Sequence, residues 1–593
     1  MSILVALQIL VLVCCLQQLQ AIPQQPSPGN QLFTQAVTGV KTIADALGKA
    51  YDNLCPGNCD STCSQDLCRP LPDNSSPICF KKARNESILF NCTNPHQEQR
   101  CISVSVTIDK SSVTYVRENG NPKMDATVFQ RSAVCRTQRL DGTFRIVSQA
   151  FGQYFAQYYV GTIDGTLRTF PGREDGSPGN CVLYDSRRRP WYNGAIYCPN
   201  HLVILIDRGR SMKDDVSSGP SSSKLDVVKT FASSLMETVY ADSYVNVFAF
   251  GGGSDITYSK SVQVQFNSSD PNLDPLKSRI NSTTLNVTTN TQPDDFVSAL
   301  NVTLKAFQDP DVKSRNLLQN VILLTDGVFT ETINYDDPSV KDVFTRLKSL
   351  NITLFIYGIT LDHDDGMKNL SDHVSGSYQD IHEVQDFSDP LFSMGSYLGY
   401  LATCHRNMYA DPFWSPNYRD YFNISDIVTV AAPAFSADNS FVGVAAIDVI
   451  LEELGPDWSA DRNDFLNAVT EQRSNQSKVH VLPQTQRPEA FDDSSTCSNS
   501  YENSYPLCPS RRKSTGPPDK GICCDSCIRR VHKGSNSNLD IILGPIGGFV
   551  LLLVLIGACI CMFRKRKPPT PALGGSTPPQ PAGSPDDRWA RPL

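Results

Sequence analysis

Between His201 and Thr360, apolar runs of strand length alternate with stretches whose apolar residues recur at helical spacing. The strand-like runs are HLVILID, YVNVFAF, NVILLTD and ITLFIYGIT, and the helical stretches are KLDVVKTFASSLMETVY, DFVSALNVTLKAF and VKDVFTRLKSL. Continuous apolar strands are typical of a sheet that is buried on both faces, and intervening helices let successive strands run parallel. The segment therefore predicts a doubly wound α/β domain with a mostly parallel sheet.

The segments on either side of this domain have a different pattern. Residues 100–170 contain alternating strand-like runs, and after Cys404 the runs DIVTVAAPAF and FVGVAAIDVI flank a Ser-Ala-Asp-Asn turn signal. Such patterns are typical of antiparallel sheets. Because the ends of a domain often lie close together at its surface, inserting one domain into another is physically cheap. We therefore expect one antiparallel domain that is split by the inserted α/β domain.

An amphipathic helix is expected over residues 30–54, where apolar residues recur at helical spacing. These residues are Phe33, Val37, Val40, Ile43 and Leu47.

Cysteine usage indicates an oxidising compartment. Of the 20 cysteines, two lie in an apolar leader, two in a second apolar run near the C-terminus, and sixteen between these runs. An even number outside the cell favours disulfides, and zinc ligation by the dense group from Cys55 to Cys101 is the alternative. A second group, from Cys497 to Cys527, lies in polar Pro/Ser-rich sequence that we interpret as a stalk.

The two apolar runs predict the topology of the chain. Residues 1–21 end on the small residue Ala21 and are typical of a signal peptide. Residues 541–563 carry no charge, can cross about 30 Å of hydrocarbon as a helix, and precede a basic cluster at 564–567. Eleven N-glycosylation sequons all lie between the two runs. We expect a single-pass type I glycoprotein of the plasma membrane with an extracellular N-terminus.

The charges and motifs exclude several functions. The chain has 53 Lys and Arg against 61 Asp and Glu, which provides no basic face for nucleic acid. It contains no nucleophile elbow, phosphate loop or His-Glu-x-x-His motif. We therefore predict a binding protein and not an enzyme, with an extracellular hydrolase as the disfavoured alternative.

Two polar motifs end predicted strands of the α/β domain. They are Asp207-Arg208-Gly209-Arg210-Ser211 and Thr325-Asp326-Gly327. Oxygen-bearing side chains at the carboxyl ends of parallel strands meet at one edge, where they can bind a hard cation. The domain resembles a von Willebrand factor A domain, in which a bound cation leaves a coordination position for a carboxylate of the partner. The resemblance implies a Ca²⁺ or Mg²⁺ site with ligands at Asp207, Ser211, Asp294 and Asp326.

The chain departs from the family motif at two of its positions. Gly209 replaces a Ser, and Asp294 is assigned to the position where the family has a Thr ligand. The nearby Arg208 and Arg210 oppose a cation electrostatically. The alternative is a metal-free scaffold in which Asp207 and the second motif's Asp accept backbone hydrogen bonds.

A third set of residues lies on both sides of the α/β domain. The string YDSRRRPWY at 184–192 precedes the domain, and WSPNY at 414–418 and FVGVAAIDV at 441–449 follow it. A free α-amino acid needs a guanidinium for its carboxylate, a carboxylate for its ammonium, and aromatic walls. The strings resemble the Cache domain of calcium-channel alpha-2-delta subunits. The resemblance implies amino-acid contacts at Tyr184, Arg189, Trp191, Tyr192, Tyr418 and Asp448.

Without a ligand, these residues would have structural roles. Arg189 would belong to a surface ion pair, and Trp191 and Tyr192 would belong to the core.

The predicted fold class is multidomain α/β and α+β, with a Rossmann-like von Willebrand factor A domain inserted in an antiparallel-sheet Cache domain, plus one transmembrane helix. The predicted parts are a signal peptide (1–21), an N-terminal helix with a Cys-rich segment and the first Cache part (22–199), the A domain (200–403), the second Cache part (404–490), a stalk (491–539), a transmembrane helix (540–563) and a cytoplasmic Pro-rich tail (564–593).

The resemblance implies an auxiliary subunit that binds a membrane protein, for example the pore subunit of a voltage-gated calcium channel, through its A domain and a small amino acid through its Cache domain. The alternative is a stand-alone amino-acid-sensing receptor or a cell-adhesion protein.

Overall fold

A computed structural model describes residues 27–52, short stretches between 86 and 151, and most of 156–173, 185–451 and 459–477, with gaps within them. The predicted signal peptide, Cys-rich segment, stalk, transmembrane run and tail lie outside these described residues. Within the described residues, no helix combines the length and the apolar character that a membrane span requires.

The inserted α/β domain contains a six-stranded sheet with the order β12-β11-β10-β7-β8-β9. All neighbouring pairs are parallel except β8 and β9. Every residue of β7 and β11 is buried, as the continuous apolar runs predict. The strands are β7 (Asn200–Asp207), β8 (Tyr244–Phe250), β9 (Val262–Gln263), β10 (Leu318–Thr325), β11 (Ile352–Gly358) and β12 (Gly376–Asp380).

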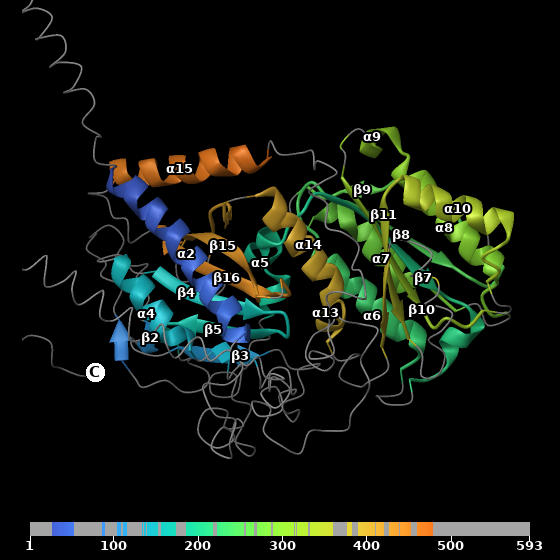
Figure 1. The fold of residues 1–593 in the computed structure, drawn as a ribbon, viewed down its shortest axis with the longest axis horizontal. Coiled ribbons are helices and arrows are strands. Elements are labelled where there is room, and N and C mark those ends of the chain that lie inside the picture. The colour runs from blue at the N-terminus through green and yellow to red at the C-terminus, as the bar shows by residue number, and fades with distance from the viewer. Residues whose placement is uncertain are drawn as a thin grey trace, which may run out of the picture. The chain divides into compact units, whose positions relative to one another are not determined.

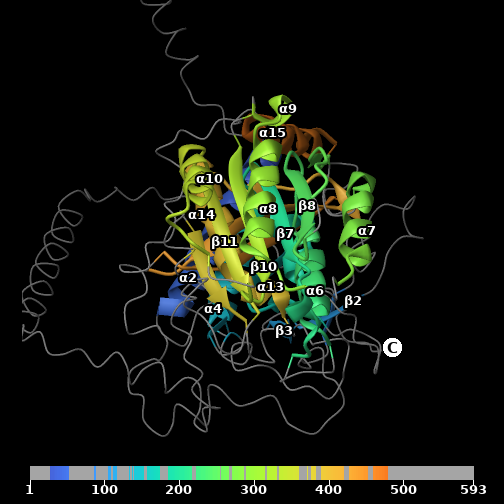
Figure 2. The ribbon, with the colours of Figure 1, turned by 90° about the vertical axis from the view of Figure 1, so that its right-hand side faces the viewer.

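Helices cover both faces of this sheet (Figure 2). Leu202 and Ile204 of β7 pack in a cluster with α6, and their neighbours Val203 and Leu205 pack in a second cluster with α8 and α10. The helices are α6 (Lys224–Met236), α7 (Asp274–Ser282), α8 (Pro293–Phe307), α9 (Pro310–Lys313), α10 (Pro338–Ser349), α13 (Pro390–Ser393) and α14 (Gly395–Met408), with 3₁₀ turns η4 (Arg210–Lys213) and η5 (Pro271–Leu273). The predicted doubly wound domain is confirmed.

A seven-stranded antiparallel sheet is assembled from segments on both sides of the insertion, and we call it the split sheet. Its order is β13-β15-β16-β4-β5-β3, with β14 also paired to β15. Strand β16 joins the two halves, because it pairs with β15 on one side and with β4 on the other. The strands are β3 (Ser112–Tyr115), β4 (Ala156–Thr162), β5 (Thr166–Phe170), β13 (Phe413–Trp414), β14 (Tyr418–Arg419), β15 (Asp426–Phe435) and β16 (Phe441–Ile450).

The predicted N-terminal helix is α2 (Pro28–Asp52), which lies across β15 and β16 (Figure 1). Val40, Ile43 and Leu47 are fully buried in the cluster between α2 and the split sheet. A small sheet of β1 (Glu86–Ile88), β2 (Val104–Thr107) and β6 (Gly172–Arg173) completes the strands.

Two helices that the strand-like patterns did not predict also pack on this cluster. They are α4 (Leu140–Ala150) and α15 (Ser459–Ser477). Leu140, Phe144 and Val147 of α4 are buried with helical spacing, so the strands expected over 100–170 occur before and after α4 but not within it.

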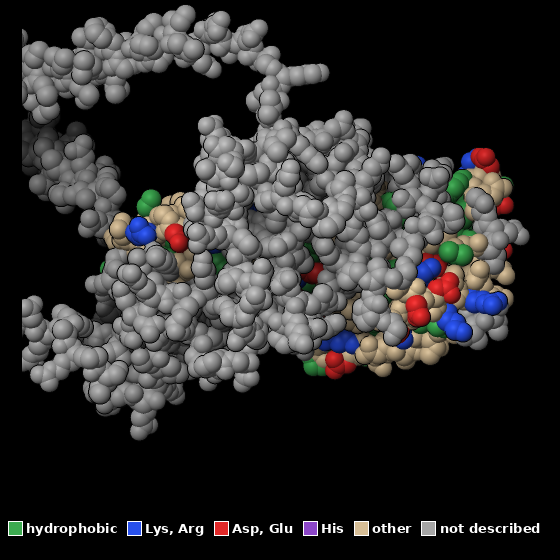
Figure 3. Space-filling model, turned by 90° about the horizontal axis from the view of Figure 1, so that it is seen from below, with side chains coloured by type: hydrophobic (Ala, Val, Ile, Leu, Met, Phe, Trp, Pro, Cys, Tyr) green, Lys and Arg blue, Asp and Glu red, His purple; other side chains and the backbone are tan. Residues whose placement is uncertain are grey.

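One hydrophobic cluster joins the two domains. It contains Leu202 and Ile204 of the inserted sheet, and also Trp191, Phe413 and Ala446 beside the split sheet. On the surface shown in Figure 3, acidic and basic side chains lie interspersed over the described residues.

Candidate functional site

The Asp207 carboxylate lies at the carboxyl end of β7 and is fully buried. Its Oδ1 accepts hydrogen bonds from the Gly209 amide (2.9 Å) and the Thr291 hydroxyl (2.5 Å), and its Oδ2 accepts one from the Thr325 hydroxyl (2.7 Å). Burial, followed by the charge of nearby Asp326, raises the pKa of Asp207 to about 6. Three donors therefore hold this carboxylate in one orientation.

The Asp326 carboxylate directly follows β10 and is also buried. Its Oδ1 accepts hydrogen bonds from the Ser211 hydroxyl and the Val328 amide, both at 3.1 Å. Its Oδ2 lies 3.1 Å from the ammonium of Lys224, the first residue of α6. The two predicted acidic ligands thus lie at one sheet edge together with Ser211.

Asp294 has a different position from the one expected. It lies exposed in the first turn of α8, whereas Thr291, three residues earlier, donates to Asp207. The threonine directly before Gln292-Pro293 was the available signal, because Pro marks the start of a helix. The position of Thr291 also explains why residue 209 is a glycine, since a Cβ at this position would overlap the Thr291 hydroxyl.

The donor set only partly fits a divalent cation. Carboxylates and hydroxyls are the oxygen donors that hard cations prefer. However, Asp326 already has a cationic partner from the chain itself. No group of three or more His, Cys, Asp or Glu side chains suited to a metal occurs among the described residues. The metal site therefore stays a prediction.

A second polar cluster surrounds Asp448, which is buried in β16. The hydroxyls of Tyr159 (2.5 Å) and Thr429 (2.6 Å) both donate to Asp448 Oδ1. Thr429 is in turn 2.6 Å from the hydroxyl of Tyr418. The Trp191 ring packs edge-on against Tyr159, with centroids 4.8 Å apart.

The structure thus joins three of the predicted amino-acid contacts, Trp191, Tyr418 and Asp448, through Tyr159 and Thr429, which the sequence reading missed. Residues two apart on a strand face the same side of a sheet, so Ala446 and Asp448 share a face of β16. Tyr159 pairs with Ala446, and the alternating pattern of β4 could therefore have indicated that its side chain lies near Asp448.

The remaining predicted contacts are placed as follows. Tyr192 is fully buried, and its ring packs against Trp191 and Phe441. Arg189 is half-buried at the N-terminus of α5 (Pro190–Ala195), two residues before Trp191. Tyr184 lies outside the described residues.

Arg187, two residues before Arg189, has a structural role that the sequence reading did not assign. Only 1% of its side chain is exposed, in the 3₁₀ turn η3 (Ser186–Arg188). It donates to Asp185 (2.9 Å), to the Ile163 carbonyl (2.9 Å) and to Asp389 at the start of α13 (2.9 Å). Burial lowers the pKa of Arg187, but the charges of Asp185 and Asp389 raise it by more. Arg187 therefore links the split sheet to the inserted domain.

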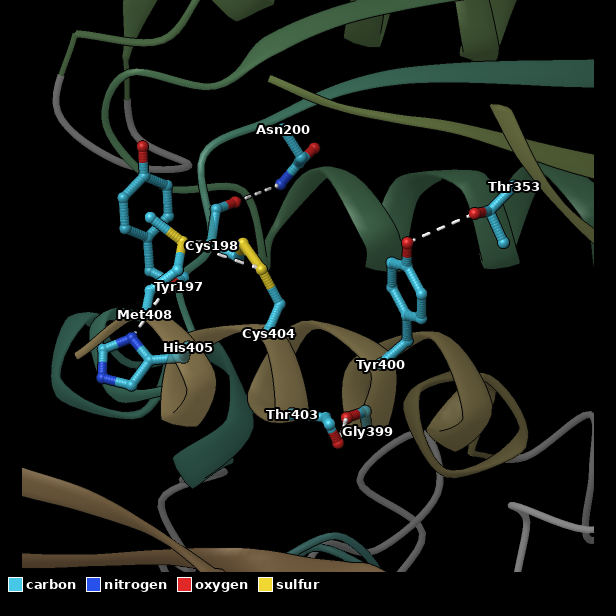
Figure 4. Close-up of a disulfide and its surroundings, with 10 residues drawn as sticks. All are labelled: Tyr197, Cys198, Asn200, Thr353, Gly399, Tyr400, Thr403, Cys404, His405 and Met408. Atoms are coloured by element: carbon cyan, nitrogen blue, oxygen red, sulfur yellow. Dashed lines mark hydrogen bonds between the residues drawn. A yellow bond between two sulfur atoms is a disulfide. The ribbon is translucent and has the colours of Figure 1, made fainter. Parts of the chain in front are cut away.

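A disulfide closes the inserted domain at its base (Figure 4). It joins Cys198, just before β7, to Cys404 in α14, with Cα atoms 5.9 Å apart. Beside it, Nδ1 of His405 lies 2.7 Å from the Tyr197 carbonyl. The expectation of disulfides is confirmed for this pair.

Residues 201–393 match the family model of the von Willebrand factor type A domain. The chain is 22% identical over 325 residues to the human "Voltage-dependent calcium channel subunit alpha-2/delta-2" and 26% identical over 326 residues to the human alpha-2/delta-4 subunit. These matches cover 52% and 50% of this chain, and 26% of each relative. The chain thus contains a von Willebrand factor type A domain and resembles alpha-2/delta subunits, although its match spans about a quarter of their length.

A pilus adhesin, SpaC from Lactobacillus rhamnosus GG, is among the similar solved structures. It is 13% identical, with a TM-score of 0.27 over 43% of this chain and 39% of that chain. A score this low supports no functional argument.

Proposed function

We propose that this chain is a non-catalytic, membrane-anchored recognition subunit at the plasma membrane. In this proposal the split sheet is a Cache domain that binds a free α-amino acid, and the A domain binds a membrane-protein partner. The observation that carries the proposal is the buried Asp448 carboxylate with its aromatic neighbours.

The chemistry around Asp448 supports a cationic group of the ligand. A carboxylate is a strong partner for an ammonium, because a hydrogen bond between two ionised groups is among the strong ones in proteins. The hydroxyls of Tyr159 and Thr429 fix the orientation of the Asp448 carboxylate. The Tyr159 and Trp191 rings add apolar surface and negative ring faces beside it. Arg189 would bind the carboxylate of the ligand.

Calorimetry of the purified full-length chain against a panel of the common amino acids tests this function. We expect saturable heat for amino acids with apolar side chains. Asp448→Asn and Arg189→Ala should each weaken binding about 30-fold or more, because each leaves one ligand charge without its partner.

The matched control is Asp426→Asn, at the start of β15, which should bind as the wild type does. Circular dichroism should show that all variants are folded. Absence of heat for every amino acid, or equal affinities of wild type and Asp448→Asn, would refute the amino-acid site.

The partner is proposed from the resemblance to calcium-channel subunits. Affinity purification of the chain from native membranes should recover the pore subunit of a voltage-gated calcium channel. Reproducible purification without any such subunit, together with intact amino-acid binding, would instead select a stand-alone receptor or an adhesion protein.

A further inference from the structure

Lys224 occupies a position that its helix alone would not favour. It is the first residue of α6, and the N-terminus of a helix carries partial positive charge that disfavours a cation. Its position is nevertheless closely fixed. The Lys224 amide donates to the Asp214 carbonyl (3.0 Å), and Ser223 and Asp226 form a capping box around it.

The Lys224 side chain points to the carboxylates at the carboxyl edge of the parallel sheet. Its ammonium lies 3.1 Å from Asp326 Oδ2, and only 15% of the lysine side chain and none of the aspartate side chain are exposed. Charge-assisted hydrogen bonds of this kind are among the strong ones in proteins. The local cost at the helix terminus is therefore offset by an ion pair with a buried carboxylate.

The two carboxylates at this edge already have hydrogen-bond donors and one cationic partner from the chain itself. Asp207 accepts hydrogen bonds from the Gly209 amide and the hydroxyls of Thr291 and Thr325, and Ser211 donates to Asp326. A divalent cation bound here would meet the positive charge of the ammonium at close range, and like charges repel strongly in a partly buried site.

We propose that the Lys224 ammonium is a tethered substitute for the divalent cation, so that the A domain folds and binds its partner without metal. This proposal concerns the A domain only, and it is independent of amino-acid binding by the split sheet. Removing the ammonium should convert the edge into a site for Ca²⁺ or Mg²⁺, because Asp326 would then lose the cation that pairs with it.

The experiment compares thermal unfolding of the full-length chain in EDTA and in millimolar CaCl₂ or MgCl₂. The wild-type midpoint should be the same in all three solutions. Lys224→Met should unfold at a lower temperature in EDTA and gain roughly 3 °C at a cation concentration about 100-fold above its Kd, because a ligand bound only by the folded state stabilises it. This gain should vanish when Asp326→Asn is added to the same variant.

Two controls isolate the ammonium. Lys224→Arg keeps the charge and should stay insensitive to cations, and Lys213→Met removes an exposed lysine from the neighbouring turn η4 and should behave as the wild type does.

A cation-independent midpoint of Lys224→Met would overturn the proposal. So would saturable Ca²⁺ or Mg²⁺ binding by the wild-type chain that Asp326→Asn abolishes. The wild-type titration decides the matter even where Lys224→Met does not fold.

Discussion

Three consecutive arginines precede the inserted domain, and their side chains have different environments. Arg187 is buried between two aspartates, Arg188 is exposed and pairs with Glu237, and Arg189 is half-buried. Successive residues of a 3₁₀ turn point about 120° apart, so the side chains of Arg187 and Arg188 face different surroundings. The sequence shows three adjacent positive charges, but it does not show which arginine points inward.

Arg187→Met should destabilise the protein by about 3–5 kcal/mol, because it removes the buried cation that pairs with both Asp185 and Asp389 and leaves Asp185 with only the more exposed Arg188. Lys260→Met is the matched control and should change the free energy of unfolding by less than about 1 kcal/mol, since both members of its ion pair with Asp311 are exposed. Urea unfolding of both variants measures the difference. Equal effects would show that the buried ion pairs contribute no more than a surface contact.

The structure places the motif residues Asp207, Ser211 and Asp326 at one edge of the sheet, as expected for strand ends in a parallel sheet. The same reasoning assigned the family's Thr position to Asp294 and found neither Thr291 nor Lys224. Both depend on the path of loops and on the direction of a side chain, which strand and helix patterns do not describe.

At the scale of elements, the spacing of apolar residues predicted helix α2. It did not predict how closely α2 packs on the split sheet. A Cβ at Gly48 would overlap the Phe435 carbonyl oxygen, and one at Gly39 would press against Val147. The two glycines therefore let α2 approach β15 and β16. Helix α4 was missed because its apolar residues occur among strand-like runs, and the weakly amphipathic α15 gave little periodic signal.

Gly48→Ala should destabilise the protein by about 1–3 kcal/mol, because the helix must move away from the backbone of β15. Gly142→Ala is the matched control: it lies in α4, where a Cβ meets nothing within 4 Å. That substitution should stabilise the protein by up to about 1 kcal/mol through helix propensity alone. Chemical denaturation distinguishes the two, and stabilisation by both would contradict the close approach of α2.

At the scale of the whole molecule, the split of one sheet around an inserted domain was predicted and is confirmed by the pairing of β16 with β4. The shared hydrophobic cluster and the Arg187 link were not predicted, since contacts between domains leave no periodic signal in the chain. The two domains are therefore expected to unfold cooperatively.

Global stability should also fall in mild acid, because burial lowers the pKa of His405 to about 4 and that of His201 to about 3, from 6.5. Below pH 6.5 the unfolded chain binds protons that the folded chain does not. Each histidine therefore lowers the free energy of unfolding by up to about 1.4 kcal/mol per pH unit as the pH falls. His405→Asn keeps a donor for the Tyr197 carbonyl. Between pH 6.5 and 4.5 it should reduce the pH dependence of the free energy of unfolding by the contribution of one histidine, up to about 1.4 kcal/mol per pH unit. An unchanged slope in thermal unfolding at graded pH would refute the assignment.

The bond between Cys198 and Cys404 also affects how the protein would respond to tension. A partner that pulls on the A domain transmits force to the rest of the chain through the two strands of polypeptide at the base of the insertion. Because these are covalently joined at that base, the force cannot separate them and peel β7 away from the sheet. A protease that cuts a loop of the A domain between these two cysteines would likewise leave both fragments covalently attached.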